Sequence, residues 1–267
     1  MTNTQAWDYA LGMIKVDGLE PTDEFKEYVE KEKRGEVTMA DIKQYLDKKY
    51  KVKGDVVNAW YLPIWGTDVL KNLLGIRDRK LLEEAEAGYV SYRLKEIALN
   101  PLPGDYDYGH LLQMHQYIFQ DMYEWAGQQR KLNIYKEEPV LGGLSIDYSE
   151  IFDIPRDSER VLAEMRSKDW SAMNTHEAAV QFSDSLSKLW RVHPFREWNT
   201  RTTVTFCCQY ADEVGLNPNR DLFENNAQYV RTSLVAYNAV FDDLGDMSKP
   251  EYLIKIVEDA LTRWKKA

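Results

Sequence analysis

Apolar residues recur at helical spacing along most of the chain, and this pattern predicts an all-helical fold with one β-hairpin. In the first fifty residues it indicates three short amphipathic helices, over residues 4–16, over residues 22–34, and from Thr38 onward. A threonine stands at the start of the second and third helices, where its hydroxyl can accept a bond from a free N–H group of the first turn. Three helices this short bury too little surface to be stable alone, so we expect them to dock on the rest of the chain.

Longer elements are predicted after residue 60. Helical periodicity continues over residues 81–99, 110–127, 158–165, 175–190, 225–241 and 250–264. Residues 128–136 alternate in polarity and lead into the glycine-rich residues 137–143, so this stretch is the candidate β-hairpin. No run reaches the roughly eighteen apolar residues of a membrane-spanning helix. The first residues also lack a basic and apolar leader, so we expect a cytoplasmic protein without a signal peptide.

Composition narrows the class of protein. The 267 residues carry a net charge of −10, which argues against binding to nucleic acid or to an anionic membrane. The two cysteines, Cys207 and Cys208, are adjacent in an apolar run, so we expect buried free thiols. His110 and His115 are five residues apart and do not share a helix face, which favours structural roles over a metal site.

The densest group of chemically active side chains is residues 193–201, which read His-Pro-Phe-Arg-Glu-Trp-Asn-Thr-Arg. Residues 202–208 continue as a run that predicts a buried helix. The first turn of a helix has free N–H groups and the positive end of the helix dipole, so it stabilises an anion such as phosphate. Asn199 and Arg201 stand beside that turn, and the pattern therefore predicts a phosphate site.

His193 and Glu197 supply the remaining chemistry of this segment. His193 precedes a proline, which disfavours the helical conformation, so we expect its imidazole on a loop at the lip of the site. A neutral imidazole can accept the proton of a hydroxyl near working pH. Glu197 is the candidate ligand of a divalent cation, because Mg²⁺ prefers one or two carboxylates together with phosphate oxygens. Together these roles predict transfer of a phosphate-containing group to a hydroxyl.

The same nine residues resemble the signature of the Fic family, His-x-Phe-x-Asp/Glu-Gly-Asn-Gly-Arg, whose members transfer AMP from ATP to a Tyr, Thr or Ser hydroxyl of a protein. The resemblance implies a Fic fold, His193 as general base and Glu197 as Mg²⁺ ligand. The implied nucleotide and phosphate site comprises Phe195, Arg196, Trp198, Asn199, Thr200 and Arg201, with Phe195 as the buried anchor of the loop.

Three positions depart from the family pattern. Trp198 and Thr200 replace two glycines, where the absence of a side chain lets backbone N–H groups approach phosphate. Val204 replaces the second arginine that in many Fic enzymes binds the terminal phosphate of ATP. We expect Arg231 to supply the missing cation, with a solvated surface arginine as the alternative.

The alternating stretch resembles the Fic flap, which borders the active site and holds a target segment by strand addition. The expected target-docking residues are Leu132, Asn133, Ile134, Tyr135 and Lys136. The alternative is a hairpin that only covers the core.

Residues 17–21 read Asp-Gly-Leu-Glu-Pro and residues 34–36 read Arg-Gly-Glu. Through these residues the N-terminal segment resembles the VbhA-type antitoxin module that accompanies certain Fic proteins. The resemblance implies a helical regulatory module over residues 1–54 and a Fic domain over residues 55–267, with its core at about residues 60–240. Met13 and Asp17, followed by Gly18, occupy the positions of the family's inhibitory Ser/Thr-x-x-x-Glu-Gly helix. An Asp facing the uncharged Val204 would gain nothing, so we expect the module to serve as a packing element or to use another arginine. The alternative is an ordinary helical extension.

The expected activity is therefore protein adenylylation with ATP and Mg²⁺, in a bacterial protein of toxin–antitoxin type. The expected partners are a target protein with a Tyr, Thr or Ser hydroxyl, the intramolecular module and, as one option, a second copy in a homodimer. Two alternatives stay open. One is a Doc-like protein kinase, because Doc-type relatives also lack the second arginine, and the other is a catalytically silent Fic-fold binding module.

Overall fold

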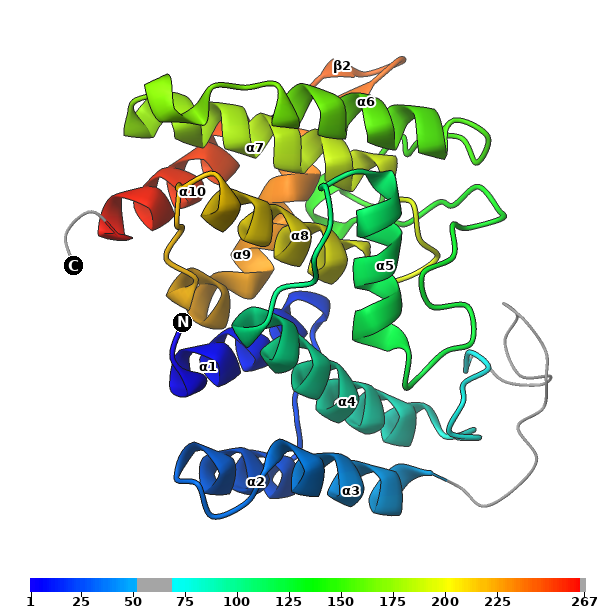
Figure 1. The fold of residues 1–267 in the computed structure, drawn as a ribbon. Helices are drawn as coiled ribbons and strands as arrows, with labels where there is room; N and C mark the ends of the chain where they lie inside the picture. Colours follow the sequence, from blue (N-terminus) through cyan, green and yellow to red (C-terminus); the bar gives the residue numbers. More distant parts are fainter. Residues whose placement is uncertain (52–68, 265–267) are drawn as a thin grey trace. The chain divides into compact units, whose positions relative to one another are not determined.

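The computed structural model describes residues 1–51 and 69–264, and Figure 1 shows their helices. The chain folds as two compact units, Met1–Leu102 with Gln113–Gln128, and Pro103–Leu112 with Gln129–Ala267. Within these residues the fold is all-helical with one short β-hairpin, the class that the sequence predicts. The sequence also predicts a solvated linker at residues 48–54 and a loop at residues 66–72. Residues 52–54 and 66–68 lie outside the described residues, whereas residues 48–50 belong to the helix Met39–Tyr50, so the linker prediction is wrong there.

The first unit is built on one long helix. Its elements are α1 (Asn3–Ile14), the 3₁₀ turn η1 (Lys15–Asp17), α2 (Asp23–Lys33), α3 (Met39–Tyr50), α4 (Arg79–Leu99) and the later part of α5 (Tyr108–Phe119). Both α1 and α3 pack on α4, and α2 contacts α1 and α3. The three predicted N-terminal helices are thus confirmed, and they dock as expected.

Side-chain caps fix where the N-terminal helices begin. The Thr22 hydroxyl accepts from the Phe25 N–H at 3.3 Å, and Thr38 forms a reciprocal capping box with Asp41. These bonds satisfy N–H groups that have no partner inside the helix. The predicted threonine caps are therefore confirmed.

A buried carboxylate joins the first two helices to α4. Glu32 in α2 accepts from Trp7 Nε1 at 2.7 Å and from Lys95 Nζ at 3.0 Å, and Asn3 Nδ2 is a third donor at 2.8 Å. The Lys95 and Glu32 side chains are only 5% and 10% exposed. Burial raises the pKa of Glu32, but the three hydrogen bonds outweigh it and leave that pKa below its ordinary value. The first fifty residues are therefore anchored by charge as well as by apolar packing.

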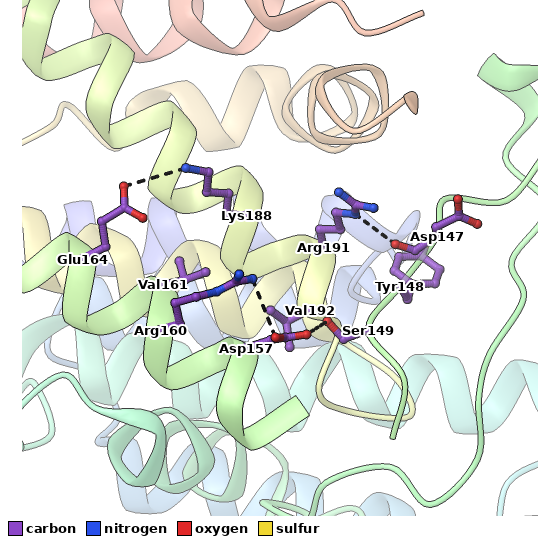
Figure 2. A pocket seen from close by; sticks show the side chains of 10 residues that line it. All are labelled: Asp147, Tyr148, Ser149, Asp157, Arg160, Val161, Glu164, Lys188, Arg191 and Val192. Carbon is purple, nitrogen blue, oxygen red and sulfur yellow. Dashed lines mark hydrogen bonds and ion pairs between the residues drawn. The ribbon is translucent and has the colours of Figure 1, made fainter. Parts of the chain in front are cut away.

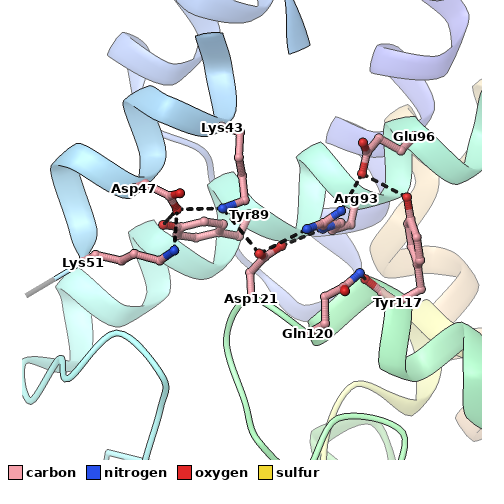
Figure 3. Close-up of polar contacts among 9 residues, drawn as sticks. All are labelled: Lys43, Asp47, Lys51, Tyr89, Arg93, Glu96, Tyr117, Gln120 and Asp121. Atoms are coloured by element: carbon pink, nitrogen blue, oxygen red, sulfur yellow. Dashed lines mark hydrogen bonds and ion pairs between the residues drawn. The ribbon is translucent and has the colours of Figure 1, made fainter. Parts of the chain in front are cut away.

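A second polar network joins α3 and α4 to the turn that follows α5 (Figure 3). Arg93 donates to Asp121 at 2.6 Å, and Lys43 lies 3.4 Å from the same carboxylate. The hydroxyl of Tyr89 donates to Asp47 at 2.8 Å. Two cations thus hold Asp121 in the turn after the helix. The predicted helix over residues 110–127 is wrong in length, since α5 ends at Phe119.

The second unit is organised around α7. It contains the start of α5, η2 (Pro139–Leu141), α6 (Ile154–Arg166), η3 (Trp170–Ala172), α7 (Thr175–Val192), α8 (Asn199–Glu213), α9 (Asp221–Tyr237), β1 (Val240–Phe241), β2 (Gly245–Asp246) and α10 (Pro250–Trp264). Helix α7 contacts α6, α8, α9 and α10. The residues of α8 from Asn199 to Ala211 are all buried, which confirms the predicted buried helix.

The hairpin lies elsewhere in the sequence than predicted. Strands β1 and β2 pair antiparallel with Val240 opposite Asp246, at the end of a segment predicted to be helical. Residues 128–138 form no strand, because side chains replace ladder bonds there. The Lys136 N–H donates to Ser145 Oγ at 3.1 Å, and the Ile151 N–H donates to Asn133 Oδ1 at 3.0 Å.

The remaining cysteine and histidine predictions hold. Cys207 and Cys208 are free and buried, and burial raises the pKa of Cys208 to about 12. His110 and His115 are also buried, and His115 Nδ1 accepts from the Gly127 N–H at 2.8 Å. Within the described ranges no helix is long and apolar enough to cross a bilayer.

Replacing Lys95 by Met should destabilise the protein by about 3 kcal/mol, because it leaves the Glu32 carboxylate buried without its cation. The control is Lys26→Met, whose ion pair with Glu20 has side chains 39% and 60% exposed and should cost less than about 1 kcal/mol. Urea unfolding measures both. Because the folded pKa of Glu32 is depressed, its contribution is present above the unfolded pKa and is lost as pH falls through the folded value. Equal losses in the two variants would contradict the anchoring role.

Candidate functional site

The turn between α7 and α8 carries the candidate base. His193 caps the C-terminus of α7 with φ 51° and ψ 58°, so it leaves the α-helical region as predicted for a residue before proline. Its side chain, however, is buried, with only 3% of the residue exposed. The expectation of an imidazole at an open lip is therefore wrong, because aromatic rings and a buried arginine surround this turn.

Arg130 fixes this turn in place. Its Nε donates to the His193 carbonyl at 2.8 Å, and its backbone N–H donates to the Pro194 carbonyl at 2.8 Å. The same guanidinium donates to the carbonyls of Leu132, at 2.9 Å, and of Ser149. Arg130 is only 1% exposed, so its charge is balanced by these carbonyl dipoles. Sequence analysis did not single it out, because nothing local marks an arginine that bonds a turn 63 residues away.

The environment of His193 keeps its imidazole neutral. Burial lowers the pKa of His193 well below its ordinary value, and the charges of Lys136, Arg130 and Arg231 lower it further, while the Trp190 carbonyl opposes them. Nδ1 lies 3.3 Å from that carbonyl, and Nε2 is buried without a hydrogen-bond partner among the described residues. An imidazole that is neutral and has a free nitrogen can accept a proton from a docked hydroxyl.

The side chains of Asn199 and Thr200, the predicted phosphate ligands, hydrogen-bond within the loop and to α7 in this structure. Asn199 Oδ1 accepts from the Phe195 N–H at 2.9 Å, and Asn199 Nδ2 donates to the Phe195 carbonyl at 2.8 Å. The hydroxyl of Thr200 accepts from Trp190 Nε1 at 2.9 Å. Phe195 is fully buried, as an anchor should be. These contacts close the loop that presents the start of α8.

Trp198 preserves the backbone conformation that a glycine would adopt. It precedes α8 with φ 61° and ψ 26°, a left-handed conformation that costs a side-chain-bearing residue about 1–2 kcal/mol. No side chain caps the helix, so its first N–H groups remain directed at the site. Trp198 is 9% exposed, and the centroid of its ring lies 6.0 Å from Cζ of the fully buried Arg201. The tryptophan at this position therefore leaves the start of α8 without a side-chain cap.

Glu197 faces a lysine. Lys136 Nζ donates to the Glu197 carboxylate at 3.1 Å, and the Glu197 side chain is 38% exposed. Across residues 1–51 and 69–264 there is no group of three acidic, histidine or cysteine side chains that could hold a metal. Glu197 can still supply one of the one or two carboxylates that Mg²⁺ uses when phosphate oxygens complete its shell. Glu197 thus fits a metal whose other ligands are phosphate oxygens of a nucleotide. Arg196, the residue before it, is half-buried.

Arg231 is held by a buried acid. It donates to both oxygens of Glu138, at 2.8 and 3.0 Å, and Glu138 is 1% exposed. The Arg231 side chain is still 29% exposed, so it is an ion-paired arginine at the edge of the core. Arg231 also lies close enough to His193 for its positive charge to lower the pKa of the imidazole.

Residues 132–136, the expected target-docking residues, form an irregular loop of the second unit. Leu132 and Tyr135 are 57% and 68% exposed, which is unusual for apolar side chains of this size. Asn133 bonds Glu150, and the Tyr135 hydroxyl donates to the Gly143 carbonyl at 3.2 Å. Ile134 is half-buried, so the loop presents two exposed apolar side chains on a hydrogen-bonded frame.

Met13, Asp17 and Gly18 belong to the first unit. Met13 is fully buried in the core of that unit, and Asp17 is exposed in η1. Gly18 has φ 75°, the left-handed conformation expected of a residue that ends a helix.

A cavity of about 470 Å³ lies beside the end of α7 (Figure 2). It is lined by Asp147, Tyr148, Ser149, Asp157, Arg160, Val161, Glu164, Lys188, Arg191 and Val192. Val192 immediately precedes the candidate base, and the ring of Tyr148 lies 4.2 Å from the imidazole, centroid to centroid. Sequence analysis missed Tyr148, since an isolated tyrosine in a loop carries no signal of such a contact.

Comparison with known proteins agrees with this arrangement. Residues 105–211 match the Fic/DOC family. The "Probable protein adenylyltransferase y4lH" of Sinorhizobium fredii is 36% identical over 167 residues, which are 59% of this chain and 81% of the relative. The chain belongs to the Fic/DOC family.

Two further relatives extend the comparison. "Protein adenylyltransferase VbhT" of Bartonella schoenbuchensis is 31% identical over 172 residues, or 64% of this chain, and the match spans only 34% of that protein. The structure of an N-terminal Fic domain of a putative cell filamentation protein from Bartonella quintana, with bound ADP, has a TM-score of 0.59 at 20% identity. It covers 80% of this chain and 95% of that one, and it shows that the fold is shared.

Replacing Lys136 by Met should raise the pKa of His193, because a nearby positive charge that opposes protonation is removed. Histidine NMR titration measures the change directly. Lys255→Met, at an exposed position of α10, is the matched control and should leave the titration unchanged. An unchanged His193 pKa in the Lys136 variant would show that this lysine does not act on the base.

Proposed function

We propose that the protein transfers AMP from ATP to a Tyr, Thr or Ser hydroxyl of a target protein. The observation that carries the proposal is the neutral, buried imidazole of His193, fixed in the turn that leads to the uncapped N-terminus of α8. Relatives named protein adenylyltransferase support the reaction class, and so does a Fic domain of the same fold described with bound ADP.

In this mechanism His193 accepts the proton of the target hydroxyl at Nε2. The hydroxyl oxygen then forms a bond to the α-phosphorus of ATP, the bond from that phosphorus to the bridging oxygen breaks, and pyrophosphate leaves. The first N–H groups of α8 and the guanidinium of Arg201 stabilise the negative charge on the phosphoryl oxygens. Mg²⁺, when held by Glu197 and the donor phosphates, supplies further neutralisation of that charge.

A Doc-like phosphotransfer is the second candidate, and one position favours it. Val204 is apolar and 1% exposed, so the place of the second arginine offers no contact to a terminal phosphate. Arg231 can replace that contact only if it leaves Glu138, which binds it through both oxygens. The two reactions differ in which phosphate of ATP reaches the target.

Two further roles complete the proposal. Residues 132–136 dock the target segment, since Leu132 and Tyr135 expose apolar surface on a hydrogen-bonded loop. The N-terminal helices, with Met13, Asp17 and Gly18, serve as an intramolecular packing module. The complete burial of Met13 and the anchoring of Glu32 support that role.

ATP labelled on the α- or on the γ-phosphate separates the two reactions. We expect α-label to enter a protein acceptor, with automodification as the first readout, and His193→Ala to reduce it about 10²- to 10⁴-fold. His176→Ala is the matched control, because His176 lies on the same helix α7 with its side chain 65% exposed. Transfer of γ-label would favour the kinase, whereas equal labelling by wild type and His193→Ala would remove His193 from the mechanism.

Binding of the donor can be tested without turnover. ATP with Mg²⁺ at about a hundred times its dissociation constant should stabilise the folded protein by about 2.7 kcal/mol. Arg201→Met should abolish the stabilisation by nucleotide, because it removes a buried cation at the start of α8. A wild-type protein whose unfolding is unaffected by any nucleotide would be a silent binding module.

A further inference from the structure

The imidazole of His193 is oriented mainly by aromatic rings. Tyr148 lies against it with 4.2 Å between ring centroids and 37° between planes, and Trp190 meets it edge-on at 5.4 Å and 86°. The hydrogen bond at Nδ1 is long, at 3.3 Å, and therefore weak. The packing of Tyr148 thus contributes directly to where the free nitrogen points.

Two arginines hold Tyr148 on the base by binding the carbonyls on either side of it. Arg191 Nε donates to the Asp147 carbonyl at 3.0 Å, as Figure 2 shows. Arg130 donates to the Ser149 carbonyl and, at 2.8 Å, to the carbonyl of His193 itself. Ser149 also donates from its hydroxyl to Asp157 at 2.8 Å. The backbone of Tyr148 is therefore tied to the same turn that carries the base.

The contact is made by the ring of Tyr148 and does not depend on its hydroxyl. That hydroxyl is buried and has no hydrogen-bond partner among the described residues, so it does not hold the ring in place. Burial raises the pKa of Tyr148 well above its ordinary value, so the side chain is uncharged. Phenylalanine would keep the stacked ring, which makes Tyr148→Phe a conservative variant.

We propose that Tyr148 is a positioning residue for the base, whose ring holds the imidazole of His193 in one orientation and covers it on the side of the cavity in Figure 2. This rests on the proposed function, in which His193 is the base. Tyr148 borders both the cavity and the imidazole. A smaller side chain there would open the imidazole to the cavity and to water.

The charges around the imidazole determine the sign of the effect. Lys136, Arg130 and Arg231 act on it from the neighbouring loop and from α9, and each disfavours its protonation. Two of these cations have acidic partners: Lys136 pairs with Glu197, and Arg231 pairs with Glu138. Burial is the largest cause of the depressed pKa of His193, so removing the covering ring should raise that pKa toward its ordinary value.

The test compares Tyr148→Leu with Tyr148→Phe by NMR titration of the protein's four histidines, with the His193 signal assigned from His193→Ala. Tyr148→Leu should raise the pKa of His193, move the acid limb of the transfer rate to higher pH and lower kcat about ten- to a hundredfold. Tyr148→Phe should restore both the titration and the rate. Tyr28→Leu is the matched control, because Tyr28 stacks on Tyr45 at the same 4.2 Å in the other unit.

An unchanged His193 titration in Tyr148→Leu, or a Phe variant as impaired as Leu, would overturn the proposal. Should Tyr148→Leu fail to fold, Arg191→Gln releases the Asp147 carbonyl from an exposed position, and it should shift His193 in the same direction by a smaller amount. No shift in that variant would also overturn it. The titration needs no substrate, so a protein that shows the shift but transfers no label would fail the proposed function alone.

Discussion

The candidate site depends on the guanidinium of Arg130. It is buried and donates to the carbonyls of His193, Leu132 and Ser149, while its own N–H bonds Pro194. These acceptors lie on three segments, and no β-ladder of the described residues pairs them. A planar group with five donors can join such segments where a strand ladder is absent. This contact ties both ends of the loop from residue 131 to residue 149 to the turn that carries the base, beside the Lys136–Glu197 and Arg191–Asp147 contacts.

Burial gives the same residues their chemical properties. A buried imidazole beside Lys136, Arg130 and Arg231 remains neutral, and a neutral imidazole is the form that accepts a proton. Glu138 binds Arg231 and Glu197 binds Lys136, so two of these cations are each paired with an acid. The cationic surroundings that depress the pKa of His193 are also suited to a phosphate-bearing donor.

The departures from the family signature differ in their consequences. Trp198 keeps the left-handed backbone of a glycine, so the start of α8 is preserved at the expense of local strain. Thr200 replaces a glycine with a hydroxyl that Trp190 uses. Val204 is buried and supplies no cation at its own position. The candidate replacement, Arg231, comes from another helix and is already paired with Glu138.

The sequence by itself determined the helical class, the capped N-terminal helices, the buried helix after the motif and the identity of the candidate base. Each of these depends on local periodicity, on a cap or on a fixed spacing, and such signals lie within a few residues. Only the tertiary structure decided that the hairpin lies at Val240–Asp246, that α5 stops at Phe119 and that Asn199 closes a loop. The tertiary structure also revealed the contacts of Arg130, of Tyr148 and of the Glu138–Arg231 pair. These contacts join residues that are 45 to 93 positions apart in the chain, and they act through burial and charge.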